Sequence, residues 1–192
     1  MFVKSKAQKA FENGITLEHF GISTPTPIAY IEQKRKYLPS KSYYISAFTN
    51  DVSIKSLLER NTPDRKMVEA FASLIAQMHI HGIVHHDLNL SNVLYHEENN
   101  IYNLTLIDIN RMTFKKKGKL TLDNCKDDFM RFTGRLDVFI AVLYCYARLR
   151  GWNAECFVRK QVLKKIKHDA NWTTRKKIHS FFHKIFHRCY TL

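Results

Sequence analysis

Two segments of the chain repeat apolar residues at the three- and four-residue spacing of an amphipathic helix. The first covers residues 6–20 and meets Gly21, which predicts a helix end. The second opens with a proline, a favoured first residue of a helix, and covers residues 63–81 before Gly82. In the first helix, the apolar residues near helical spacing are Ala7, Phe11 and Ile15, with Ala10 and Leu17. In the second, we expect the buried stripe to be Met67, Ala70, Phe71, Leu74, Ile75 and Met78.

Runs of β-branched and aromatic residues separate these helices and follow the second one. Residues 28–32 and 43–48 flank a basic connector that contains a proline, and this arrangement predicts a β-hairpin. Residues 83–84 and 93–95 predict short strands on either side of a polar loop.

The rest of the chain is mostly helical by pattern. A polar turn at residues 96–100 and a strand at about 104–107 come first. The helices expected are at roughly 125–150, 153–168 and 172–189, with a short one earlier at 54–59. No internal repeat or low-complexity linker interrupts the order of helix, hairpin and further helices. We therefore predict one α+β domain.

Length and composition limit the class of protein. A chain of 192 residues suits one domain with a sizeable core. No run of 18 or more apolar residues occurs, so we expect no membrane-spanning helix. The first six residues lack the apolar core and cleavage site of a secretory signal, which predicts a cytoplasmic protein.

Cysteine and histidine spacing argues against a metal or disulfide scaffold. The four cysteines are Cys125, Cys145, Cys156 and Cys189, and without a CxxC pair they favour reduced thiols. The ten histidines show no HExxH or other ligand spacing. We expect the following histidines to lie on helix surfaces: His79, His81, His179, His183 and His187.

The charge is unusual, with 31 basic against 17 acidic side chains and a formal net charge of +14. Such an excess attracts anionic partners, whether nucleic acid, a phosphorylated glycolipid or an anionic membrane surface. The chain has no helix-turn-helix, zinc or aromatic RNP pattern, which argues against nucleic acid as the partner.

One polar loop combines the residue types that phosphoryl transfer from a nucleotide needs, a carboxylate near the acceptor hydroxyl and hard oxygen ligands for Mg²⁺. The run His85-His86-Asp87-Leu88-Asn89-Leu90-Ser91-Asn92 has the spacing H-x-D-x-x-x-x-N, and Asp108 ends the next strand. We predict that Asp87 is the base and that Asn92 and Asp108 bind the metal. His85 is expected to brace the loop.

Each of these residues also has a purely structural explanation. Taken singly, Asp87 and Asn92 fit the ordinary roles of aspartate and asparagine in turns and helix caps. Taken together, the four residues match kinases in type and order, which favours the catalytic explanation. The match supports a kinase-like fold more strongly than it supports kinase activity.

The motif and its flanks resemble a known family. The runs HGIVHHDLNLSNVL, LIDINRM and YARLRGW, and the N-terminal KSKAQKAFENGITLEHFGISTPTPIAYIE, are similar to lipopolysaccharide kinases that phosphorylate inner-core sugars, especially the Kdo (3-deoxy-D-manno-octulosonic acid) kinases. The resemblance implies a protein-kinase-like fold with ATP and Mg²⁺ as cofactors. It also implies a hydroxyl acceptor on lipid A-linked Kdo, at the cytoplasmic face of the inner membrane.

The resemblance implies which segments of the chain correspond to the two lobes of a kinase domain. Residues 1–50 correspond to a truncated N-lobe and residues 51–192 to the C-lobe of one kinase-like domain. Glu12 matches the helix glutamate that pairs with an ATP-binding lysine; the alternative is a solvated helix residue.

The chain also departs from the kinase pattern. Asp108-Ile109-Asn110 stands for DFG, and Asn89 stands where protein kinases usually carry a lysine. A glycine-rich loop and a strand-borne lysine belong before Glu12, and only five residues precede the first predicted helix, so we expect both features to be lacking in this chain. The lysines ahead of Glu12 are helical or close to the helix, and none is assigned the ATP role: Lys4, Lys6 and Lys9.

A second hypothesis follows from these departures. The chain is then a truncated, non-catalytic kinase-like module that binds an anionic glycolipid or a protein partner. On either hypothesis, we expect the hairpin at 28–48 to have an exposed sheet edge.

Two basic stretches fit an anionic partner. Lys115–Lys119 lies where an activation segment would run, and it either attracts lipid A or Kdo anions or is a solvated charged turn. The tail at 155–192 carries ten Lys or Arg against two acidic residues, interleaved with apolar ones. We expect the apolar residues to pack on the core and the basic outer faces to contact anionic lipid.

Overall fold

The computed structural model describes residues 4–35, 38–115, 120 and 125–189, with the backbone alone at a few positions and after residue 172. The helices are α1 (Lys6–His19), α2 (Lys55–Leu58), α3 (Arg65–Ile80), α4 (Lys126–Met130), α5 (Leu136–Leu149) and α6 (Ala154–Cys189), with 3-10 turns η1 (Leu90–Asn92) and η2 (Ile109–Arg111). The strands are β1 (Pro27–Arg35), β2 (Leu38–Ser46), β3 (Val52–Ser53), β4 (Ile83–Val84), β5 (Val93–Glu98), β6 (Ile101–Leu106) and β7 (Thr113–Phe114).

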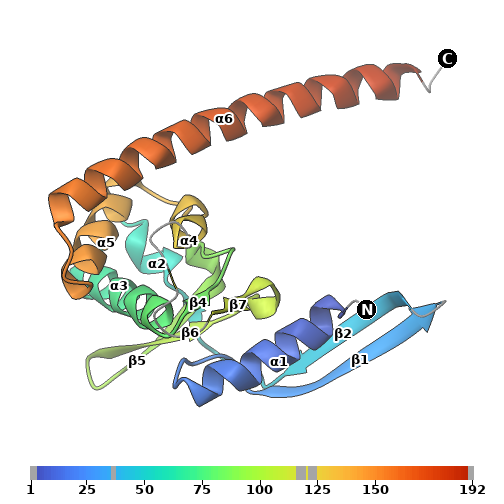
Figure 1. Cartoon of the computed structure of the whole chain (residues 1–192), viewed down its shortest axis with the longest axis horizontal. Helices are drawn as coiled ribbons and strands as arrows, with labels where there is room; N and C mark the ends of the chain where they lie inside the picture. Colours follow the sequence, from blue (N-terminus) through green and yellow to red (C-terminus); the bar gives the residue numbers. More distant parts are fainter. Residues whose placement is uncertain (1–3, 36–37, 116–119, 121–124, 190–192) are drawn as a thin grey trace.

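Figure 1 shows α1 and the β1–β2 hairpin beside a mainly helical body, from which α6 extends. The described strands form three small antiparallel sheets, β1–β2, β3–β5–β6 and β4–β7. The predicted α+β class is confirmed, as are the helices predicted at 6–20, 54–59 and 63–81.

Helix α1 starts with a side-chain cap and approaches the hairpin closely at Gly14. Ser5 Oγ accepts the backbone N–H of Gln8 at 3.0 Å, which satisfies one free donor of the first turn. A Cβ at Gly14 would lie 2.8 Å from Cγ of Pro27, so the helix and β1 approach closely there. The buried stripe comprises Ala7, Ala10, Gly14 and Leu17. Of the apolar residues at helical spacing, Ala7, Ala10 and Leu17 are buried, whereas Phe11 is half-buried against Tyr30 of β1 and Ile15 is 49% exposed.

Strands β1 and β2 form the predicted hairpin and are longer than the two apolar runs. They pair antiparallel, with Tyr30 opposite Tyr44, and no third strand joins them in the described part of the chain. Ile28, Ile31 and Tyr43 are more than half exposed. The expected exposed sheet edge is therefore present.

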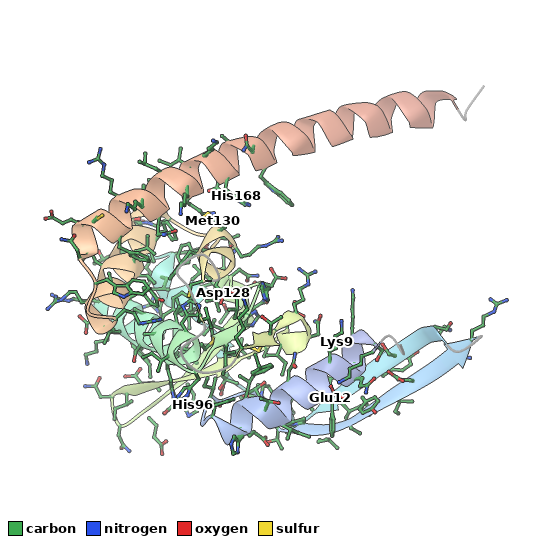
Figure 2. The ribbon with its side chains drawn as sticks, in the orientation of Figure 1. Lys9, Glu12, His96, Asp128, Met130 and His168 are labelled. Atoms are coloured by element: carbon green, nitrogen blue, oxygen red, sulfur yellow. The ribbon has the colours of Figure 1, made fainter. Side chains whose placement is uncertain are left out.

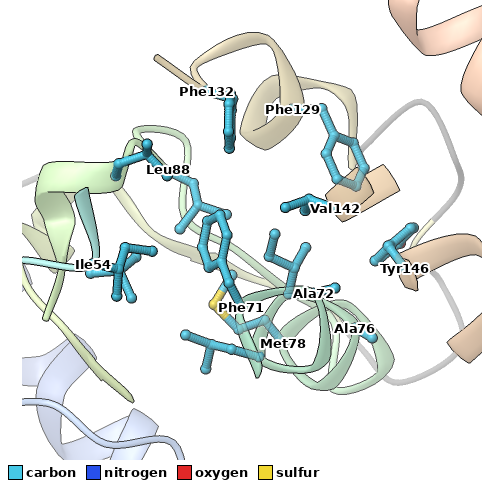
Figure 3. Packing of buried hydrophobic residues seen from close by; sticks show 14 of the residues in the cluster. Ile54, Phe71, Ala72, Ala76, Met78, Leu88, Phe129, Phe132, Val142 and Tyr146 are labelled. Atoms are coloured by element: carbon cyan, nitrogen blue, oxygen red, sulfur yellow. The ribbon is translucent and has the colours of Figure 1, made fainter. Parts of the chain in front are cut away.

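The core of the body forms around α3 (Figure 3). This helix begins at Asp64, whose carboxyl group accepts the N–H of Met67 at 2.9 Å. Its predicted stripe is confirmed except for Ala70, which is only half-buried. Figure 3 shows α3 side chains packed with Phe129, Phe132, Val142, Tyr146 and Leu88. Because Leu88 belongs to the polar loop and is 1% exposed, the loop itself is anchored in this core.

The β5–β6 hairpin is longer than the sequence predicted. The polar turn predicted at 96–100 is confined to residues 99–100, because β5 continues to Glu98 and β6 already starts at Ile101. The connection is the pair Asn99-Asn100, with φ of +51° and +62°. Asparagine tolerates this left-handed conformation, which two-residue hairpin turns require.

The helix predicted at 125–150 is divided into α4 and α5. Arg135 precedes α5, and its guanidinium donates to the carbonyls of Arg60 at 2.7 Å and Asn61 at 3.2 Å. It also pairs with Asp137 in the first turn of α5 at 2.6 Å. These contacts with the segment that follows α2 hold the start of a new helix, which the apolar periodicity of the sequence did not reveal.

The helices predicted at 153–168 and 172–189 are one helix, α6. No glycine or proline lies between the two predicted segments, and Lys165 pairs with Asp169 at 2.8 Å across the expected break. Phe157 is buried, whereas Leu163 and Ile166 are 61% and 52% exposed. The prediction that the apolar residues of the tail pack on the core was therefore wrong from Leu163 to Trp172, the last side chain described. In the described part of the chain, no helix is long and apolar enough to cross a membrane.

Gly82 offers a test of the turn that joins α3 to the polar loop. Its φ is +81°, and a Cβ there would lie 2.2 Å from the backbone oxygen of Lys115. We expect Gly82→Ala to lower the free energy of unfolding by about 2–4 kcal/mol, measured by urea denaturation.

Gly21→Ala is the matched control, because Gly21 also follows a helix with φ of +66° but has no atom within 4 Å of the added Cβ. It should cost only the backbone strain of about 1–2 kcal/mol. Equal losses for the two variants would contradict the close approach of Lys115 to Gly82.

Candidate active site

The polar loop of residues 85–92 leaves β4 and ends in η1. Its hydrogen bonds converge on the carbonyl of Asp87, which accepts the Asn89 N–H at 3.0 Å and Asn92 Nδ2 at 2.9 Å. The Asn89 side chain caps η1 by accepting the Ser91 N–H at 2.9 Å. The loop therefore holds Asp87 and Asn92 side by side, as the motif predicted.

A buried aspartate of α4 binds the start of this loop. Asp128 Oδ2 accepts the backbone N–H of His85 at 2.9 Å, and Oδ1 accepts that of His86 at 2.6 Å. His86 has φ of +64°, which is uncommon for a residue other than glycine. Asp128 is 1% exposed and lies within the body in Figure 2. No sequence motif marks Asp128, because its partners are 42 and 43 residues away.

His79 is buried at 1% exposure, so its predicted place on a helix surface was wrong. Its Nε2 lies 3.3 Å from Asp128 Oδ2, and its Nδ1 lies 2.9 Å from the hydroxyl of Tyr146. Burial raises the pKa of Tyr146, so this hydroxyl keeps its proton. The sequence held a signal for the burial of His79, because position 79 is four residues after Ile75 in the buried stripe of α3.

His85 connects the loop to the end of β6. Its ring is fully buried, and Nε2 lies 3.1 Å from the carbonyl of Ile107. Nδ1 has no hydrogen-bond partner among the described residues. Burial lowers the pKa of His85, which favours a neutral ring whose Nε2–H donates to Ile107. This geometry suits the bracing role predicted for His85.

Asn92 lies against the strand end that carries Asp108, because the N–H of Ile107 donates to the Asn92 carbonyl at 3.0 Å. Asn92 Nδ2 donates to the Asp87 carbonyl, and the other polar atom of this side chain, Oδ1, is an oxygen of the kind that binds a cation. Asp108 is exposed with φ of +54°, and its Oδ1 accepts Nδ2 of Asn110. These amide and carboxylate oxygens are the ligand types that Mg²⁺ prefers.

The two side chains do not make a complete metal cage. Within the ranges that the structure describes, no three His, Cys, Asp or Glu side chains gather into a metal cluster. Mg²⁺ commonly takes one or two protein ligands and completes its shell with water and substrate phosphates. Asn92 and Asp108 therefore fit a magnesium ion that arrives with a nucleotide.

Arg111 adds a cation that the sequence reasoning missed. Its Nη1 lies 3.0 Å from Asp87 Oδ2, and the side chains of Arg111 and Asp87 are 51% and 20% exposed. The signal available in the sequence was an arginine three residues after Asp108, in the run LIDINRM.

Glu12 lies on α1, beside the β1–β2 hairpin in Figure 2. Lys4 Nζ lies 2.6 Å from Glu12 Oε2, and this hydrogen bond lowers the pKa of Glu12. Lys4 directly precedes the cap of α1, so the ion pair does not come from a strand. Asn13 Nδ2 donates to the carbonyl of Ile109 at 2.7 Å, which brings α1 against the turn after Asp108. The pairing of Glu12 with an ATP-binding lysine stays a prediction.

The basic loop and the cysteines lie partly outside the described residues. Of Lys115–Lys119, only Lys115 lies within the described residues. Among the described residues, Cys125, Cys145 and Cys156 form no disulfide, and their reduced state stays a prediction. The side chain of Cys189 lies outside the described part.

The fold is protein-kinase-like. Its helical body carries the loop of residues 85–92 and the strand-end Asp108, and a helix and a hairpin lie beside it. The model of the lipopolysaccharide kinase (Kdo/WaaP) family matches residues 4–127. The chain therefore belongs to this family, whose members are kinases of the lipopolysaccharide core, and the predicted resemblance is confirmed. Kinases of this kind use ATP and Mg²⁺ in general.

One solved structure, that of WaaP, supports the fold. A structure described as WaaP in complex with acyl carrier protein is 19% identical, covers 83% of this chain and 76% of its own, and superposes with a TM-score of 0.61. An ADP/Mg²⁺-phosphoaspartate complex of Rio2 kinase from Chaetomium thermophilum is 18% identical, with coverages of 86% and 54% and a TM-score of 0.47. A search of curated proteins gave no match.

Asp128→Asn tests whether the buried carboxyl group secures the loop. An amide can accept at only one of its two ends, so one backbone N–H of His85 or His86 loses its buried acceptor. We expect the free energy of unfolding to fall by about 2–3 kcal/mol in urea denaturation. Glu97→Gln, the same change from carboxyl to amide on an exposed residue of β5, is the control and should leave the unfolding midpoint almost unchanged. A similar small effect at both positions would show that the Asp128 contacts do not stabilise the loop.

Proposed function

We propose that the protein is an ATP- and Mg²⁺-dependent kinase that phosphorylates a hydroxyl of a lipopolysaccharide inner-core sugar, namely Kdo linked to lipid A. The observation that supports this most directly is the hydrogen bond from Ile107 N–H to the Asn92 carbonyl. It joins the loop that carries Asp87 to the strand end that carries Asp108. A candidate base and two candidate metal ligands thus meet at one place.

In the proposed reaction, Asp87 orients the acceptor hydroxyl and takes its proton. A bond forms between the acceptor oxygen and the γ-phosphorus, while the bond from that phosphorus to the bridging oxygen of ADP breaks. The electron pair of the broken bond leaves with ADP. Asp87 is 20% exposed, so its carboxylate is accessible to an acceptor while its backbone is fixed by Asn89 and Asn92.

Asn92 and Asp108 would hold the Mg²⁺, which neutralises charge on the phosphates. In the protein itself, fixed hydrogen bonds keep both oxygen ligands in place. Asn92 is held through its side-chain amide and its carbonyl, and Asp108 through Asn110. Such pre-organisation reduces the cost of positioning during the transfer.

An anionic sugar acceptor suits the charge of the chain. The net charge of +14 raises the local concentration of phosphorylated glycolipid, and the family acts on the lipopolysaccharide core. The Kdo unit is proposed from the similarity of the motif flanks to Kdo kinases.

We further propose that α6 binds the anionic membrane surface where such an acceptor resides. The outer side of this helix exposes Arg159, Lys160 and Lys167 together with Leu163 and Ile166. Basic side chains attract anionic headgroups, and neighbouring apolar side chains insert at the interface. The exposure of Leu163 and Ile166 is otherwise unfavourable for a helix surface in water.

Asp87→Asn provides the test of catalysis. With Mg²⁺, ATP and Kdo-lipid A, we expect the variant to lose phosphate transfer by about 10²–10⁴-fold, because the amide cannot take the hydroxyl proton. The readout is radiolabelled phosphate on the glycolipid, and Asp137→Asn serves as the control that keeps wild-type activity.

Thermal-shift titration separates this proposal from the non-catalytic alternative. Binding of ATP and Mg²⁺ to the folded state must raise the melting temperature with ligand concentration. A wild-type protein that neither transfers phosphate nor is stabilised by millimolar nucleotide would favour the module that only binds a glycolipid or protein.

Vesicle flotation tests the membrane surface. We expect the double variant Lys160→Glu, Lys167→Glu to bind vesicles with anionic lipid at least about tenfold more weakly than the wild type, given roughly 1 kcal/mol per basic residue near such a surface. The control Lys55→Glu, Lys66→Glu makes the same change in net charge on α2 and α3. Equal losses in both variants, or equal recovery of the wild type from neutral and anionic vesicles, would refute a role of α6.

A further inference from the structure

The only basic side chain seen to bind the candidate base in the described part of the chain is Arg111. Its Nη1 donates to Asp87 Oδ2 at 3.0 Å. The loop itself offers no cation at the corresponding place, since position 89 is an asparagine. The Asn89 side chain is moreover committed to the loop, because its Oδ1 accepts from both the N–H and the hydroxyl of Ser91.

Arg111 contacts the candidate base through its guanidinium and lies three residues after the candidate metal ligand Asp108. Arg111 ends η2, the turn that starts directly after Asp108. This turn is fixed from the other side by Asn13 of α1, whose amide donates to the Ile109 carbonyl at 2.7 Å. The backbone at Arg111 is thus tied to the same elements that hold Asp108 and Glu12.

The Arg111–Asp87 contact is poorly explained as a stabilising ion pair. The Arg111 side chain is 51% exposed, and ion pairs with such exposure contribute little to stability. A guanidinium has five N–H donors, and Asp87 is the only side-chain partner that the described residues give it. Most of its donors therefore remain for a ligand with several acceptor oxygens.

We propose that Arg111 is a catalytic residue that binds the phosphoryl group during its transfer and holds the Asp87 carboxylate toward the acceptor hydroxyl at the same time. This inference rests on the proposed kinase function and deepens it. During transfer, negative charge spreads over the three equatorial oxygens of the phosphoryl group, and an arginine fork matches two such oxygens. Arg111 neither gains nor loses a proton, because the hydroxyl proton goes to Asp87 and the electron pair of the broken bond leaves with ADP.

This assignment accounts for the asparagine at position 89. The cation that protein kinases usually carry in the catalytic loop comes here from the turn after the strand-end aspartate. An arginine keeps its charge at any physiological pH and offers planar, bidentate donors, whereas a lysine offers a point charge.

Arg111→Gln and Arg111→Lys test the proposal in the full chain by isothermal titration with Mg²⁺-ATP and Mg²⁺-ADP, together with the kcat of transfer to Kdo-lipid A. For Arg111→Gln we expect the preference for ATP over ADP to fall about tenfold, with ADP affinity retained, and kcat to fall about 10²–10³-fold. Arg111→Lys should restore part of the ATP preference, because the charge is kept and the fork is lost.

Arg65→Gln is the matched control. Arg65 also forms an exposed ion pair with a carboxylate, Glu69, at 3.1 Å, but on α3. It should keep both the ATP preference and kcat of the wild type.

The outcomes distinguish this inference from the proposed function. If the wild type prefers ATP and transfers phosphate, and Arg111→Gln keeps the same ATP preference, Arg111 does not meet the phosphoryl group and the inference is overturned, even if kcat falls. If the wild type binds neither nucleotide and transfers nothing, the proposed function fails and this inference fails with it.

Discussion

The candidate site depends on one contact. The buried carboxyl group of Asp128 accepts hydrogen bonds from two backbone N–H groups of the loop. A buried acid is costly unless its oxygens are hydrogen-bonded, and Asp128 meets this condition with the backbone of His85 and His86. His86, whose N–H donates to Asp128 Oδ1, lies in the left-handed region with φ of +64°, so the buried carboxyl group binds the loop where its backbone is most unusual. Leu88, inserted in the core, fixes the loop a second time.

From this anchor, a chain of contacts reaches every candidate functional group. His85 binds the Ile107 carbonyl and Ile107 binds the Asn92 carbonyl, so the loop and the end of β6 form one unit. Asp108 follows directly, and the turn after it is bound by Asn13 of α1. The side chains proposed for chemistry are more exposed than the groups that hold them. Rigid support with accessible functional atoms is the arrangement expected of a pre-organised site.

The outer parts of the molecule are built differently. The β1–β2 hairpin and the outer side of α6 keep apolar side chains in contact with water, among them Ile28, Ile31 and Leu163. Such exposure contributes nothing to the stability of the fold, and it is typical of surfaces that meet other molecules. The catalytic proposal concerns the well-packed body, whereas the proposed membrane contact uses one of these outer surfaces.

The sequence by itself determined the helices α1, α2 and α3, the first hairpin and the motif loop. Their signals are local: apolar spacing, caps and turn residues lie within a few positions of one another. The spacing of His85, Asp87 and Asn92 likewise lies within one loop. Only the tertiary structure decided three further features: the burial of His79, the role of Asp128, and the pairing of Arg111 with Asp87. These contacts join residues 24 to 67 positions apart, and no local pattern records which distant side chain will fill a buried position.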